Sequence, residues 1–148
     1  MLKHLSQRWG VFVLGGSNLA TISIIVTSPA LDSQGAYSAL RFIQATIEKG
    51  HSVNGVFFYQ AGVTVANGFQ TVLSDELALY EKWQDLAQQH KIPLQVCVTA
   101  ANRRGVISHE DAQQDKNRHD HNLVSPFQSV GIGELVAMLN ESDKSIQF

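Results

Sequence analysis

The chain has 148 residues, which is the length of one ordinary globular domain. Hydrophobic residues make up 44% of it and charged residues 16%, so the chain can form a core and is not an intrinsically disordered segment. The formal net charge is -2 and no basic stripe is visible, which argues against direct binding of nucleic acid. The low charged fraction suggests that other subunits cover part of the surface.

Residues 1–20 stand apart from a single domain that we expect over residues 21–148. Lys3 and Arg8 with the apolar residues 9–15 resemble a weak export signal. The apolar run is too short to span a membrane, which takes about 20 apolar residues. We expect the first segment to be a disordered extension, or the result of a start codon assigned too far upstream.

The first half of the chain alternates strand and helix patterns. Residues 22–27 are β-branched and mostly apolar, as in a buried parallel strand. Residues 36–49 carry apolar side chains at helical spacing and end before Gly50. Residues 53–59 predict a second strand, followed by a polar loop. Ser74, followed by two acidic residues, predicts a helix over residues 74–90. Its candidates for burial are Leu77, Tyr80, Leu86 and Ala87.

The second half continues the alternation. Residues 94–98 predict a third strand, and a short helical segment follows around residues 100–104. Residues 109–121 are polar without apolar periodicity, which indicates a surface loop or a short exposed helix. Residues 131–140 predict a helix and residues 144–148 a closing strand. We therefore expect a three-layer α/β fold, with a flavodoxin-like parallel sheet of about five strands and helices on both faces.

The only cysteine, Cys97, is the strongest candidate for chemistry. It cannot form an intramolecular disulfide, so a reduced, cytoplasmic setting is expected. It lies near the carboxyl end of a predicted strand, where a following helix and Arg103 and Arg104 would favour the thiolate that attacks a sulfane sulfur. The alternative is a buried core cysteine without a chemical role. Tyr59 and Asn67 are candidates either for lining the site or for packing.

Other motifs do not form a site. His119, Asp120 and His121 match no zinc-binding spacing, and we expect a solvated loop there. Residues 131–133 lack the third glycine of a dinucleotide loop and are interpreted as a helix entry. Residues 15–17 lack the lysine of a phosphate loop. The sequence therefore predicts neither a metal nor a cofactor.

Four blocks of sequence resemble the DsrE/TusD family. They are residues 25–27 with Pro29-Ala30; residues 56–59 followed by Gly62-Val63 and Ala66-Asn67; residues 95–98 leading into Ala100-Ala101 and residues 103–106; and residues 131–135 continuing through Asp143 to Gln147-Phe148. The order and spacing of these blocks span residues 21–148. The segment before residue 21 is foreign to the pattern.

The resemblance implies a sulfurtransferase that carries sulfur as a persulfide on Cys97. It implies assembly with TusB-like and TusC-like subunits of the same fold into a heterohexamer made of two heterotrimers. A TusA-like donor would supply the sulfur and a TusE-like carrier would accept it, for 2-thiouridine formation at the tRNA wobble position. No contact with nucleic acid or membrane is implied for this chain.

Two alternatives remain open. The chain could be a DsrE-like subunit of a sulfur-oxidation complex, with the same chemistry in another pathway. It could also be a non-catalytic assembly subunit whose cysteine is merely packed. Reactivity of the thiol separates the last reading from the other two.

Overall fold

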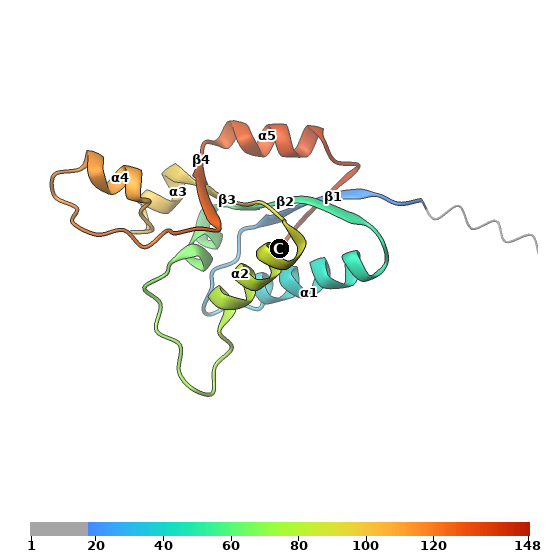
Figure 1. The fold of residues 1–148 in the computed structure, drawn as a ribbon, viewed down its shortest axis with the longest axis horizontal. Helices are drawn as coiled ribbons and strands as arrows, with labels where there is room; N and C mark the ends of the chain where they lie inside the picture. Colours follow the sequence, from blue (N-terminus) through green and yellow to red (C-terminus); the bar gives the residue numbers. More distant parts are fainter. Residues whose placement is uncertain (1–17) are drawn as a thin grey trace, which may run out of the picture.

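The computed structural model describes residues 18–148 and centres on a parallel sheet of five strands in the order β4-β3-β2-β1-β5 (Figure 1). The strands are β1 (Thr21–Val26), β2 (Ser52–Phe58), β3 (Leu94–Cys97), β4 (Phe127–Val130) and β5 (Lys144–Gln147). The expected α/β fold with a parallel sheet is confirmed. Of the extension expected over residues 1–20, residues 1–17 lie outside the described part of the chain.

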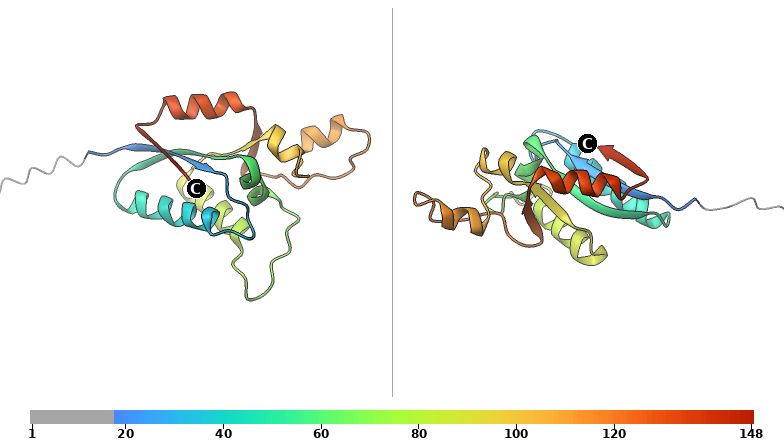
Figure 2. Two further views of the ribbon diagram at one scale, coloured as in Figure 1. Left: turned by 180° about the vertical axis from the view of Figure 1, so that it is seen from behind. Right: turned by 90° about the horizontal axis from the view of Figure 1, so that it is seen from above.

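Helices cover both faces of the sheet, as Figure 1 and the two views of Figure 2 show. The chain runs outward from β1 to β4 and then returns to the far side of β1 as β5, so right-handed crossovers place the last helix opposite the first two. The helices are α1 (Gly35–Glu48) and α2 (Leu79–His90) on one face, α5 (Ile132–Asn140) on the other, and the connecting segments η1 (Gln60–Ala66, a 3-10 helix), α3 (Val98–Asn102) and α4 (His109–Gln114). No helix in the described part of the chain has the length and apolar composition that a membrane span needs.

The core lies between the sheet and helices α1 and α2. The Phe58 ring packs edge-on against Trp83 of α2 and Phe127 of β4, with ring centroids 5.1 and 5.7 Å apart. Phe58 and Trp83 are fully buried. Because burial of a large apolar side chain contributes about 1.5–3 kcal/mol, this cluster stabilises the packing of α2 on β2 and β4.

Two elements differ from the sequence prediction. Strand β4, with the sequence Phe-Gln-Ser-Val, was not located, because an edge strand that pairs only with β3 lacks a continuous apolar pattern. The helix expected from residue 74 begins at Leu79, and its burial candidate Leu77 is 43% exposed. The Glu76 carboxylate accepts a hydrogen bond from the Leu73 N–H (3.1 Å), which holds this segment in turns.

The buried hydroxyl of Tyr80 predicts how the stability of the fold depends on pH. Its ring stacks on Phe127 at 5.3 Å, and its hydroxyl is buried without a hydrogen-bond partner among the described residues. Burial, and next the Glu81 carboxylate, raises the pKa of Tyr80 above its ordinary value of 10.0. The stability linked to the neutral hydroxyl is therefore complete below pH about 10, and it is lost as the pH rises through the folded-state pKa.

We expect Tyr80→Phe to keep the stacking and to raise the free energy of unfolding at pH 7 by about 1 kcal/mol, because an unsatisfied hydroxyl is removed. The loss of stability above pH about 10 should become shallower. Denaturant unfolding at neutral and alkaline pH measures both effects. A variant less stable than the parent at pH 7 would contradict the prediction and indicate that the hydroxyl has a partner.

Candidate functional site

Cys97 ends β3 and points to the face of the sheet that α5 covers. Side chains alternate along a strand, and Leu94 pairs in register with Phe127, which belongs to the core under α2. Leu94 and Val96 therefore face the core, and Cys97 faces the opposite side. It is the N-cap residue of α3, so the predicted position between a strand end and a helix is confirmed.

Cys97 lines a cavity of about 350 Å³. Its walls come from the junction of β2 and η1, from the end of β3, from α3 and the two arginines that follow it, and from the first residue of α5. The lining residues are Tyr59, Gln60, Cys97, Thr99, Ala100, Arg103, Arg104 and Ile132. Because Cys97 is only 4% exposed, a reacting sulfur must enter this cavity to reach Sγ.

The cavity brings Cys97 together with Arg103 and Arg104, as the sequence suggested. No carboxylate lines it. Arg104 Nη1 donates to the Ala100 carbonyl at 3.1 Å, which holds the guanidinium over α3. Among residues 18–148, neither arginine forms a salt bridge. The cavity is therefore a local region of positive potential in a chain whose formal net charge is -2.

Of the two further candidates, Tyr59 lines the cavity and Asn67 does not. Asn67 Oδ1 accepts a hydrogen bond from Asn122 Nδ2 at 2.8 Å. Asn122 Nδ2 also donates to the Gly105 carbonyl (2.9 Å), and its Oδ1 accepts from the Ile107 N–H (2.7 Å). Asn67 thus belongs to an amide network that fastens the loop after η1 to the segment after α3, so its role is packing.

Gln60 and Ile132 line the cavity but were not expected to do so. Gln60 begins η1 with a φ of 51°, a conformation that residues other than glycine rarely adopt. Ile132 is the first residue of α5, next to its N-cap Gly131, and is 52% exposed. The helix entry was predicted, but its place beside Cys97 depends on the strand order, which local sequence patterns do not encode.

The point where the strand order reverses, between β1 and β5, is closed. Such a reversal commonly forms the ligand site of a parallel sheet. Here the N–H groups of Thr27 and Ser28 donate to the Phe148 carbonyl at 2.7 and 3.3 Å. Gly62 also packs so tightly that an added Cβ would lie 2.0 Å from the Val26 carbonyl oxygen. The open cavity is therefore found at the ends of β2 and β3.

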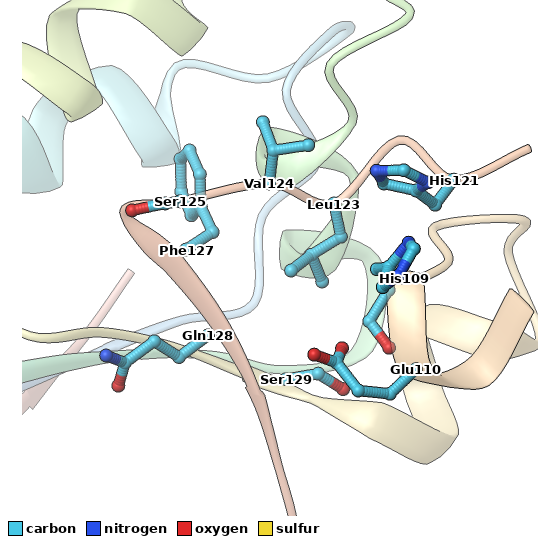
Figure 3. Close-up of a pocket in the computed structure, with 10 residues that line it drawn as sticks. His109, Glu110, His121, Leu123, Val124, Ser125, Phe127, Gln128 and Ser129 are labelled. Carbon is cyan, nitrogen blue, oxygen red and sulfur yellow. The ribbon is translucent and has the colours of Figure 1, made fainter. Parts of the chain in front are cut away.

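A second, larger cavity of about 490 Å³ lies beside α4 and β4. Figure 3 shows His109 and His121 at one end of it and Gln128 at the other. The two imidazoles meet edge to face, with ring centroids 4.9 Å apart. Within the described residues, no three histidine, cysteine or carboxylate side chains are grouped as metal ligands. The sequence has a single cysteine, Cys97, so this cavity holds no thiol.

The fold and the cavity define a class of α/β protein with a cysteine enclosed at the carboxyl edge of a parallel sheet. The chain belongs to the DsrE/DsrF-like family, whose model matches residues 20–148. This confirms the family resemblance expected from the sequence.

Two relatives have names that state an enzyme class. The chain is 41% identical over 128 residues to the sulfurtransferase TusD homolog of Vibrio cholerae, a match that covers 86% of this chain and 97% of the relative. It is 44% identical over 125 residues to sulfurtransferase TusD of Sodalis glossinidius, covering 84% and 95%. Both names carry the enzyme class expected from the sequence.

A solved structure supports the fold independently. The crystal structure of the ychN protein from E. coli superposes with a TM-score of 0.70, covering 88% of this chain and 100% of that one. The identity is 17%, so this likeness concerns the fold alone.

Proposed function

We propose that this chain is a sulfur-relay sulfurtransferase subunit that carries sulfur as a persulfide on Cys97. The observation that carries the proposal is that the only thiol of the chain lies in the cavity at the carboxyl edge of the sheet. Homology to proteins named sulfurtransferase TusD supports the same reading. A packed cysteine without chemistry would need neither the cavity nor the two arginines beside it.

Sulfur transfer to Cys97 is an exchange between thiolates. The Cys97 thiolate attacks the outer sulfur of a donor cysteine persulfide, and a new bond forms between Sγ and that sulfur. The bond between the donor Sγ and the outer sulfur breaks, and its electron pair leaves with the donor as a thiolate. The hydrogen on the outer sulfur stays with it, so the exchange yields a Cys97 persulfide without net oxidation or reduction. An acceptor thiolate then removes the sulfur by the same exchange.

The arginines assist both halves of this exchange. Thiolates and persulfide anions carry negative charge, and the positive charge of Arg103 and Arg104, which line the same cavity, stabilises them. The low exposure of Cys97 also protects the persulfide from thiols in bulk solution.

The partners we propose are those that the resemblance to the DsrE/TusD family implies. The donor is a TusA-like protein and the acceptor a TusE-like protein, and the sulfur ends in 2-thiouridine at the wobble position of tRNA. The chain works in the cytoplasm within a heterohexamer that contains TusB-like and TusC-like subunits. Exposed apolar side chains away from the cavity supply surfaces for the contacts between subunits: Leu31, Phe69 and Leu73.

The test is to locate the sulfur. The complex, co-expressed with its two related subunits, is incubated with a small persulfide donor, digested and analysed by mass spectrometry. The peptide containing Cys97 should gain the mass of one sulfur atom, and a reductant should remove it. As a control, the denatured protein should be alkylated fully at Cys97. A cysteine that gains no sulfur and resists alkylation in the native complex would favour the non-catalytic assembly subunit.

A further inference from the structure

We propose that Arg103, Arg104 and the exposed edge of α5 form a docking surface for the cysteine-bearing segment of the exchange partner, and that this segment carries acidic side chains beside its cysteine. The inference rests on the proposed function of Cys97, and it adds the chemistry of the segment that the cavity recognises.

The burial of Cys97 determines the shape of the occupant. A side chain that is 4% exposed cannot meet a sulfur presented on a flat protein surface. A cavity of about 350 Å³ has room for a few side chains. The partner must therefore insert a narrow segment with its cysteine leading.

The charge of the cavity determines the polar part of the occupant. Arg103 and Arg104 are exposed, and neither forms a salt bridge within residues 18–148. Arg104 uses one nitrogen on the Ala100 carbonyl, which leaves most of its five N–H donors for an incoming group. Guanidinium groups bind carboxylates through paired hydrogen bonds, so glutamate or aspartate beside the partner's cysteine satisfies them.

The exposed edge of α5 determines which apolar side chain the partner segment carries. Ile132 lines the cavity and is 52% exposed, and Val136, one turn further along the helix, is 56% exposed. Residues four apart lie on the same face of a helix, so these two form a short apolar stripe that leads away from Cys97. The segment is therefore expected to carry acidic groups on its arginine side and an apolar side chain on its α5 side.

The experiment compares three synthetic peptides, each with one cysteine persulfide flanked by two glutamates, two glutamines or two lysines. The rate of sulfur transfer to Cys97 is measured in the co-expressed complex. At low ionic strength the glutamate peptide should react about tenfold faster than the glutamine peptide, and the lysine peptide should be the slowest. The differences should shrink as salt is added, because exposed charges are screened.

Charge reversal provides the decisive variant. In R103E/R104E the order of the three peptides should invert. The control K82E/K116E makes the same change in net charge at two exposed lysines that do not line the cavity, and it should keep the parent's order. Ratios between peptides are compared within each variant, so any effect of the substitutions on the thiol itself cancels.

Three outcomes would each overturn either the docking surface or the proposed function of Cys97. Equal rates for all peptides, with normal loading by an uncharged small persulfide, would overturn the docking surface and leave the function of Cys97 standing. Loading by neither the peptides nor the small donor would overturn the proposed function. Inhibition by tRNA that is lost in R103E/R104E would assign the arginines to phosphate instead of carboxylate.

Discussion

Replacing Cys97 with serine is expected to abolish sulfur transfer and to leave the domain folded. Serine is close in size to cysteine, and a hydroxyl at a site that is 4% exposed costs about 1–2 kcal/mol. A hydroxyl stays protonated at neutral pH and cannot form a persulfide. Because the chain has no second cysteine, no other thiol can substitute.

The measurement is the 2-thiouridine content of tRNA in cells whose only copy of the gene carries Cys97→Ser. We expect the modification to be lost. Thermal unfolding of the purified variant is the control, and the melting temperature should fall by no more than about 7 °C. A normal 2-thiouridine content would remove Cys97 from the pathway, and a fully unfolded variant would make the loss uninformative.

The position of Cys97 was predictable because a buried strand has a recognisable apolar pattern in the local sequence. Leu94 and Val96 are fully buried in the centre of the sheet, so the strand is apolar and its carboxyl end is visible in the sequence. Edge strand β4 contacts one neighbour only and carries no such pattern. Strand β5 at the other edge was nevertheless expected after the last helix, so an edge position weakens the apolar pattern of a strand without always hiding it.

The walls of the cavity could not be predicted in the same way. Ile132 lies 35 positions from Cys97 in the sequence and reaches it only because β5 returns to the far side of β1, which carries α5 to the opposite face. Gln60 lines the cavity through a positive φ that neither its side chain nor its neighbours signal. Both residues are placed by tertiary structure, whereas Arg103 and Arg104 follow Cys97 closely enough to be suspected from spacing.

Among the contacts that position the walls of the cavity, we expect the contact between η1 and β1 to tolerate substitution least. The Val26 carbonyl oxygen accepts a hydrogen bond from the Tyr59 N–H at 2.9 Å, and the Gly62 N–H donates to the Tyr59 carbonyl at 2.9 Å. A Cβ at Gly62 would lie 2.0 Å from that same Val26 oxygen and 3.2 Å from the Cα of Thr27. All of these are backbone atoms, which cannot rotate aside as a side chain can.

We therefore expect Gly62→Ala to lower the free energy of unfolding by about 3 kcal/mol or more, because η1 must move away from β1. The shift would carry Tyr59 and Gln60 with it, so sulfur loading of Cys97 should also slow. Gly133→Ala is the matched control: a methyl group there meets no atom within 4 Å, and helix propensity favours it, so stability should be unchanged or slightly higher. Denaturant unfolding of both variants and the loading rate of Gly62→Ala are the measurements. If Gly62→Ala proves as stable as Gly133→Ala, η1 can yield without cost, and the cavity wall that begins at Tyr59 is not held by its packing on β1.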